Sequence, residues 1–296
     1  MVPARGPEQQ LQRLFTDRCW LPTHWMKTLL ICHDGADLHR EGLARWLASF
    51  STLTGIVVLQ EGKRAAWRRA RRELRRVGAI RFADELAFRL YYRLFIAGRD
   101  KAWAEGTLRT LCQRYPRLPA DTAVLHTSSP NSPSSRQFIG ECAPDIVLAL
   151  CKTLLNRAVF SIPSRGTFVL HPGTCPEYRN AHGCFWALAN DDLDKVAMTL
   201  LRVDAGVDTG PVYGYYTYDY DEVSESHIVI QHRVVLENLD ALRQRLTAIG
   251  DGVATPIDTS GRASATWGQP WLTSYVRWKS KARKRKVSES PRPALS

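Results

Sequence analysis

The sequence lacks the apolar run that a membrane-spanning helix requires. A span needs about 18 or more consecutive apolar residues, and no stretch of the 296 residues reaches that length. The first 25 residues mix arginines with acidic residues and contain no long apolar segment, which is not typical of a secretory signal. We therefore expect a cytoplasmic protein without a membrane partner.

Several short motifs that would point to metal or nucleotide chemistry are also missing. The seven cysteines form no Cys-x-x-Cys pair, so neither a zinc site nor a redox motif is expected. Their odd number and their positions in apolar runs favour free thiols in a reducing compartment. The sequence contains neither G-x-x-x-x-G-K nor G-x-G-x-x-G. Nucleotide phosphate transfer and NAD binding therefore lose their usual sequence support.

Positive charge is present but concentrated in two segments. Residues 63–76 and residues 277–292 each hold eight Lys or Arg and one Glu, whereas the whole chain carries a net charge of +12. The remainder is therefore close to neutral. Such segments can attract phosphate-bearing ligands, including RNA. The ordinary interpretation, a solvated helix face and a disordered tail, is favoured over RNA binding.

Short apolar runs alternate with segments of helical pattern along most of the chain. The runs lie at 28–33, 54–59, 124–127, 144–150, 167–170 and 197–203. This alternation predicts an α/β fold with a mostly parallel sheet that carries helices on both faces. We expect an N-terminal arm over 1–25, an α/β domain over 26–250, and a polar extension over 251–296 that ends in a basic, disordered tail.

Two polar residues follow apolar runs at places where chemistry is expected. His171 ends the run 167–170 and opens a loop rich in Pro and Gly, and Asp208 lies in a second tight turn, Asp-Thr-Gly-Pro. In open α/β sheets, ligands bind beyond the carboxyl ends of strands. A histidine with a carboxylate to orient it can act as a general acid or base at a carbonyl. The alternative is structural, with His171 satisfied in the core and Asp208 capping its turn.

These residues belong to a longer series of motifs that resembles the folate-dependent formyltransferases. That family includes the glycinamide ribonucleotide, methionyl-tRNA and amino-sugar enzymes. The resemblance covers residues 144–246 well and residues 27–59 only in outline. It implies a Rossmann-like domain. The matching residues are Pro144-Asp145, His171-Pro172, Pro176-x-Tyr178-Arg179, Trp186-Ala187-Leu188-x-Asn190-Asp191 and Val203-Asp204-x-Gly206-x-Asp208-Thr209-Gly210-Pro211.

The resemblance implies transfer of a formyl group from 10-formyltetrahydrofolate to a primary amine. The family uses an Asn-x-His motif and an Asp, which fall on His171 and Asp208 as catalytic residues. The position of the family Asn holds Val169, which cannot donate a hydrogen bond. Asn180 is the nearby candidate for a substitute donor. If no other donor acts, the chain is slow, or it has become a catalytically degenerate homologue that binds folate or a partner.

The resemblance also assigns binding residues. Thr153, Leu154 and Leu155 match the loop whose backbone meets the pterin ring, and Asp204 joins them as a cofactor-binding residue. Tyr178, Arg179 and His182 are the candidate substrate-binding residues. For Tyr178 and Arg179, packing and hydrogen bonding within the loop is the structural alternative. No metal is expected.

Two departures from known members of the family reduce the range of possible amine acceptors. The first strand is followed by His33-Asp34-Gly35-Ala36-Asp37, which is a poor phosphate cradle and disfavours glycinamide ribonucleotide. Only 46 residues follow Gly250, too few for the C-terminal barrel of methionyl-tRNA enzymes. An amino sugar is therefore the favoured acceptor, with methionyl-tRNA as an alternative. The sequence leaves the oligomeric state and the role of residues 1–25 open.

Overall fold

A seven-stranded sheet in the order β3-β2-β1-β4-β5-β7-β8 forms the centre of the molecule. The computed structural model describes residues 26–60 and 63–289, so the predicted arm over 1–25 lies outside the described residues. The strands are β1 (Lys27–His33), β2 (Thr52–Leu59), β3 (Val124–Thr127), β4 (Ile146–Ala149), β5 (Gly166–Pro172), β7 (Met198–Arg202) and β8 (Val212–Tyr216).

The sheet is parallel from β3 to β5 and turns antiparallel at β7 and β8. The side chains of β1 are buried on both faces. Leu30 and Cys32 face one apolar cluster, and Leu29 and Ile31 face another. A strand that is buried on both sides needs helices above and below it. The predicted Rossmann-like, mostly parallel α/β fold is confirmed.

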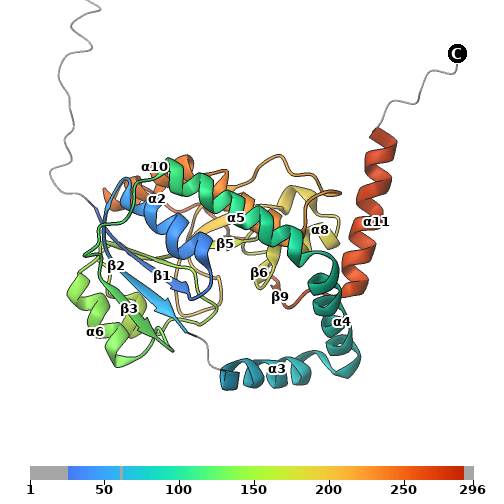
Figure 1. The fold of residues 1–296 in the computed structure, drawn as a ribbon, viewed down its shortest axis with the longest axis horizontal. Helices are drawn as coiled ribbons and strands as arrows, with labels where there is room; N and C mark the ends of the chain where they lie inside the picture. Colours follow the sequence, from blue (N-terminus) through green and yellow to red (C-terminus); the bar gives the residue numbers. More distant parts are fainter. Residues whose placement is uncertain (1–25, 61–62, 290–296) are drawn as a thin grey trace, which may run out of the picture.

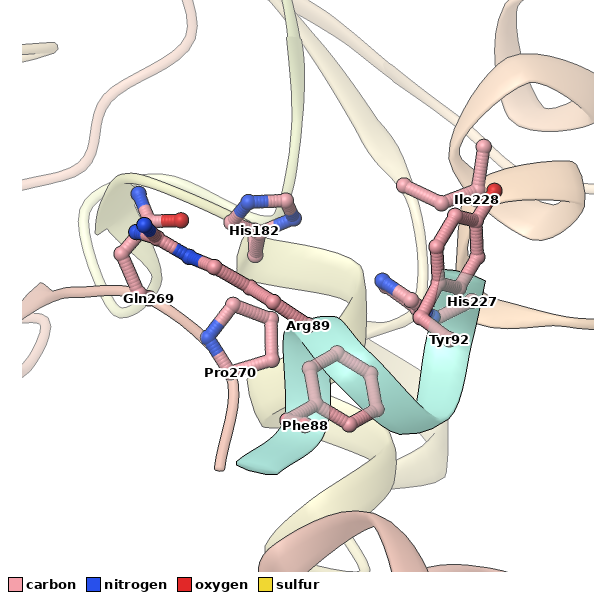
Figure 2. Close-up of a pocket in the computed structure, with 8 residues that line it drawn as sticks. All are labelled: Phe88, Arg89, Tyr92, His182, His227, Ile228, Gln269 and Pro270. Atoms are coloured by element: carbon pink, nitrogen blue, oxygen red, sulfur yellow. The ribbon is translucent and has the colours of Figure 1, made fainter. Parts of the chain in front are cut away.

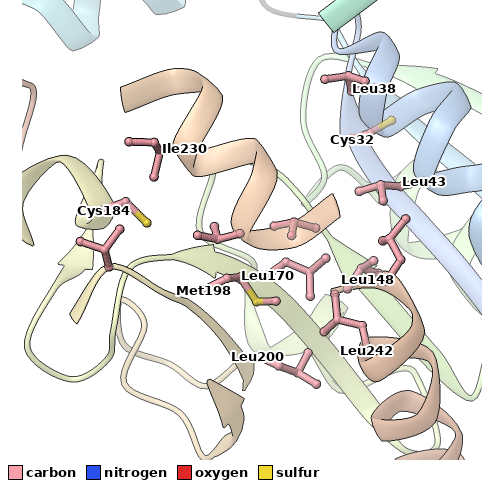
Figure 3. Packing of buried hydrophobic residues seen from close by; sticks show 14 of the residues in the cluster. Cys32, Leu38, Leu43, Leu148, Leu170, Cys184, Met198, Leu200, Ile230 and Leu242 are labelled. Carbon is pink, nitrogen blue, oxygen red and sulfur yellow. The ribbon is translucent and has the colours of Figure 1, made fainter. Parts of the chain in front are cut away.

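Helices cover both faces of the sheet. Figure 1 shows α2 (Ala44–Ala48), α5 (Ala97–Arg114) and α10 (Leu239–Gly250) on one side and α6 (Pro133–Cys142) on the other. On the larger side, side chains from β4, β5 and β7 meet α9 (His227–Leu236) and α10, as Figure 3 shows. Further helices are α3 (Lys63–Val77), α4 (Ala79–Phe95), α7 (Arg157–Phe160), α8 (Gly183–Ala189) and α11 (Leu272–Glu289), with the short helical segments η2 (Leu38–Leu43) and η3 (Leu193–Lys195). A small second sheet pairs β6 (Arg179–Asn180) with β9 (Thr266–Trp267).

The described part of the basic tail is a helix, so the expected disorder is wrong up to Glu289. Helix α11 buries Tyr275, Trp278 and Ala282, which are spaced to lie on one helix face. Lys279 is also buried, and its Nζ donates to the carbonyl oxygens of Glu222 (2.6 Å) and Glu225 (2.5 Å). The helix orders because its aromatic face packs on the core, while its cations find carbonyl and carboxylate partners.

None of the helices within the described ranges has the length and apolar character to span a membrane.

Helix α4 buries a carboxyl group. Glu85 is fully buried, and burial, followed by the negative charge of Glu73, raises its pKa to about 7. The folded pKa therefore lies above the unfolded value of about 4.3. Stability from this group is fully present below the unfolded pKa and is lost as the pH rises through about 7.

Replacing Glu85 by Gln is expected to stabilise the protein at pH 8 by about 1–3 kcal/mol, because the amide carries no buried charge. Near pH 4 the variant and the wild type should have nearly equal stability, since Glu85 is then protonated in the folded chain and mostly protonated in the unfolded chain. Urea unfolding at both pH values measures this, with Glu105→Gln on the exposed face of α5 as the control. Equal stability at pH 8 would contradict the assignment.

Candidate active site

The structure brings His171 and Asp208 together at the end of β5. The ring of His171 is buried, and its Nε2 lies 2.7 Å from the carbonyl oxygen of Tyr178. A carbonyl only accepts, so Nε2 carries the hydrogen. The other ring nitrogen, Nδ1, lies 3.4 Å from Oδ2 of Asp208. His171 is therefore fixed between a backbone acceptor and a carboxylate.

Asp208 lies in the loop between β7 and β8, and its carboxylate reaches the ring of His171. Residue Asp208 has φ 50°, a left-handed conformation that Asp tolerates better than most residues. Its Oδ2 also accepts the backbone N–H of Asn180 at 2.8 Å. One carboxylate oxygen thus faces both a backbone donor and the imidazole, which holds the pair in one geometry.

The turn that presents Asp208 is held by two of the predicted binding residues. Asp204 accepts the N–H of Gly206 at 2.9 Å and the hydroxyl of Thr209 at 2.8 Å. Arg179 donates from Nη1 to the carbonyl oxygen of Val207 at 2.9 Å. Both side chains therefore position the Asp208 turn, and their contact with cofactor or substrate stays a prediction.

Two glycines near His171 allow a close backbone crossing. A Cβ added to Gly173 would lie 2.7 Å from Cα of Gly183 and 2.9 Å from Nε2 of His171. Such distances are too short for real side chains, so a substitution at Gly173 would move the histidine. This requirement follows from the folded path of the chain and was not found from the sequence.

The other predicted residues near His171 are held by the protein itself. The side chain of Tyr178 is buried, stacks on Trp267 with ring centroids 5.4 Å apart, and donates its hydroxyl to Asp192 at 2.9 Å. Its contribution to His171 is therefore its backbone carbonyl. The side-chain amide of Asn180 donates to the carbonyl oxygen of Trp267 at 2.5 Å, so one of its two hydrogens is engaged.

Val169 lies on the same face of β5 as His171, because the two residues are two positions apart in the strand. It is half-buried and packs against a small apolar cluster that contains Cys175, Leu201 and Val212. The position where the resemblance implies an amide is therefore apolar in this chain.

The predicted pterin loop follows β4 and lies at the carboxyl end of the parallel strands. Asn131 pins it on both sides, donating to the carbonyl oxygen of Leu154 at 2.8 Å and accepting the N–H of Asn156 at 2.7 Å. Leu154 is exposed and Leu155 is buried. Next to the loop, the N–H of Lys152 donates to Nε2 of His33 at 3.1 Å. The ligand contacts of Thr153, Leu154 and Leu155 stay predictions.

One predicted substrate residue, His182, lines a hollow of ≈ 180 Å³ that Figure 2 shows. The ring centroids of His182 and His227 are 5.9 Å apart. Burial lowers the pKa of His182 to about 4 and that of His227 well below its usual value, so both are neutral at pH 7. The full lining consists of Phe88, Arg89, Tyr92, His182, His227, Ile228, Gln269 and Pro270.

The hollow combines an apolar wall with unused hydrogen-bonding capacity. Within the part of the chain that the structure describes, the buried Nδ1 of His227 has no hydrogen-bond partner. Buried polar groups are normally paired, so this atom is available to a ligand. Sequence reasoning missed every lining residue except His182, because the others come from α4, α9 and the segment before α11. The residues of the described ranges include no group of three His, Cys, Asp or Glu that could hold a metal ion.

Comparison with curated proteins finds similarity to methionyl-tRNA formyltransferases. No family model matches the chain. A methionyl-tRNA formyltransferase from Dehalococcoides mccartyi is 34% identical over 118 residues, which cover 40% of this chain and 36% of the relative. A formyltransferase family therefore fits this chain. The chain matches little more than a third of the length of that relative.

Solved formyltransferase structures are also similar to this chain. A sugar N-formyltransferase from Shewanella superposes with a TM-score of 0.49 at 13% identity, covering 86% of this chain and 87% of the other. A formyltransferase from Anoxybacillus kamchatkensis, in complex with UDP-4,6-dideoxy-4-formamido-L-AltNAc and tetrahydrofolate, gives a TM-score of 0.41 at 15% identity, covering 55% of this chain and 89% of the other.

Proposed function

We propose that the chain transfers a formyl group from 10-formyltetrahydrofolate to a primary amine. The observation that carries this proposal is the His171–Asp208 pair, with Nδ1 and Oδ2 3.4 Å apart at the carboxyl end of β5. The pair occurs in a chain that is 34% identical to a methionyl-tRNA formyltransferase over 118 residues. The donor would lie against the loop at Thr153, Leu154 and Leu155, with Asp204 beside it.

The proposed reaction needs one proton acceptor and one hydrogen-bond donor to the oxyanion. The amine nitrogen attacks the formyl carbon, the new C–N bond forms, and the carbonyl oxygen becomes an oxyanion. The bond to N10 of the folate then breaks, and N10 takes a proton. Asp208 together with Nδ1 of His171 would accept the proton that the amine loses. The free hydrogen of the Asn180 amide would donate to the oxyanion in place of the missing Asn.

The hollow lined by His182 would hold the acceptor. His182 precedes Gly183, whose Cα lies against Gly173 next to the His171 ring. Aromatic and proline side chains suit the carbon face of a sugar ring, and neutral imidazoles can donate to or accept from its hydroxyl groups. An amino sugar is therefore the favoured acceptor.

Two alternatives each have one supporting observation. The apolar cluster around Val169 favours a catalytically degenerate homologue that binds folate or a partner without turnover. The identity to a methionyl-tRNA formyltransferase, together with the two basic segments, favours activity on methionyl-tRNA.

A formyl-transfer assay with 10-formyltetrahydrofolate would separate these functions. The acceptors would be free amino sugars, nucleotide-linked amino sugars and methionyl-tRNA. We expect formylated amino sugar. Folate binding by calorimetry without any product would support the degenerate homologue, and the absence of both binding and product would contradict every form of the proposal.

Replacing Val169 by Asn is expected to raise kcat about 10-fold or more, because the amide restores a hydrogen bond that strengthens as the oxyanion forms. The gain should stay below the ~10²–10³-fold effect of removing such a donor, since Asn180 would already compensate in part. Burying an amide without partners opposes the gain by about 1–3 kcal/mol of stability.

The matched control is Val169→Leu, which has nearly the shape of Asn without its donor. Turnover and thermal stability are measured on the same samples. A stable Val169→Asn protein with unchanged or lower kcat would show that position 169 does not face the reacting carbonyl.

A further inference from the structure

Helix α4 leaves an apolar side uncovered. Its opposite side is packed, with Phe88 and Tyr91 against the ring of Tyr275 in α11 and Glu85 buried. The uncovered side presents residues at spacings of three and four, which place them in one row. We call this row the apolar seam, and it consists of the exposed residues Ala79, Ala83, Leu86, Leu90 and Leu94.

The apolar seam exposes much more surface than scattered apolar residues do. The side chains of Leu86, Leu90 and Leu94 are 47%, 59% and 64% exposed. At the two ends of α4, Ile80 and Phe95 are 88% and 70% exposed. Contiguous exposed apolar surface of this kind marks an interaction site in soluble proteins.

Cations are dense in α4, which carries the apolar seam, and in the preceding α3. Residues 63–95, which make up α3 and α4, contain eleven Lys or Arg and only three Asp or Glu. Arg89 and Arg93 on α4 are exposed, as is Arg71 on α3. Helix α3 also carries an exposed tryptophan, Trp67, at 65%. Figure 1 shows both helices at one edge of the molecule, with α3 away from the central sheet.

We propose that α3 and α4 form a docking surface for an anionic lipid membrane, on which the protein lies peripherally. A basic amphipathic helix with Trp, Phe and Leu on its apolar side is the pattern that binds in the plane of a membrane interface. Each Lys or Arg near an anionic leaflet adds attraction. This proposal departs from our expectation of no membrane partner, which rested on the lack of a spanning segment.

Charge and side-chain type favour lipid over the two other occupants of such a surface. A second copy of the chain would bring the basic helices of both copies together, and like charges across an interface oppose association. RNA would be held by aromatic rings on which bases stack, whereas the apolar seam is aliphatic and the exposed rings of Trp67 and Phe95 lie outside it.

Vesicle flotation of the full-length protein tests the proposal, with vesicles of phosphatidylcholine alone and of phosphatidylcholine mixed with phosphatidylserine. We expect binding to the mixed vesicles only, weakened by salt. The triple variant Leu86→Ser, Leu90→Ser, Leu94→Ser should bind about 10-fold or more weakly, because the buried apolar area is lost. The matched control is Val253→Ser, which changes a side chain that is 73% exposed outside this surface and should bind like the wild type.

The triple variant keeps every charge, so its flotation isolates the apolar contribution to binding. Circular dichroism of the same sample shows whether the variant is folded. Equal binding by a folded triple variant would overturn the proposal, since the basic segments alone would then suffice. A wild type that stays in solution would also overturn it. In that case, the remaining occupants are distinguished by two further measurements. If light scattering shows a dimer of the wild type that the triple variant does not form, the apolar seam binds a second copy. If the wild type shifts tRNA in a gel and the triple variant does not, the apolar seam binds RNA.

Discussion

Replacing Asp208 by Asn is expected to lower the rate of formyl transfer by about 10²–10⁴-fold with little change in fold. The carboxylate receives the N–H of Asn180 at 2.8 Å and lies 3.4 Å from Nδ1 of His171. An amide has the same shape but cannot take up a proton or balance a charged imidazole. The measurement is kcat/KM with the preferred amine, alongside circular dichroism.

Replacing His171, alone or together with Asp208, is expected to lower the rate in a similar way. His171→Ala should lose activity to a similar degree, and the double variant should be no worse than either single one, because residues that act as a unit are not additive. Asp251→Asn, on the exposed end of α10, is the control and should keep full activity. Full activity in a folded Asp208→Asn protein, or losses that multiply in the double variant, would remove the pair from the mechanism.

Replacing Trp278 by Ala is expected to destabilise the protein by about 3–5 kcal/mol, the usual effect of removing a buried aromatic side chain. Trp278 is 0% exposed, and its ring lies 4.1 Å from the Nζ of Lys279. Its indole N–H also donates to Glu222 at 3.0 Å. The variant therefore opens a cavity and leaves two polar partners without their contact.

The control on the same helix is Val276→Ala, whose side chain is 53% exposed and whose change should stay within about 0.5 kcal/mol. Urea unfolding of both variants gives the comparison. Deletion of everything after Tyr275 should have at least the effect of Trp278→Ala. If the deletion left the unfolding midpoint unchanged, α11 would contribute nothing to the stability of the fold.

The strands and site residues that could be predicted are those whose signal lies in a short stretch of sequence. The buried strands were visible as continuous apolar runs, and His171 and Asp208 were visible because each follows such a run into a turn. The burial of Tyr178 was not visible, since a tyrosine in a Pro-rich loop can face either way. The helix over the basic tail was missed because the high charge of 277–292 outweighed the spacing of Tyr275, Trp278 and Ala282.

The hollow at His182 could not be predicted for a different reason. Its walls come from Phe88, His227 and Gln269, which are far apart in the sequence and meet only when α4 and the segment before α11 pack beside α9. Each of these residues alone carries no functional signal. A pocket that is assembled by tertiary contacts therefore needs the folded structure to be found.

The change from parallel to antiparallel pairing at β5 has a consequence for the order of folding. Pairing of β5 with β7 joins Pro172 to Met198, whereas pairing of β1 with β4 joins Ile31 to Ala149. The chain between Ile31 and Ala149 is more than four times longer than the chain between Pro172 and Met198. Closing the longer loop therefore has an entropic free-energy cost that is about 1.2 kcal/mol larger. We expect the β5–β7–β8 unit, which carries both His171 and Asp208, to form early. On the ribosome, the reacting pair would then be assembled by one short stretch of chain, while the hollow for the acceptor would wait for the last helix to emerge.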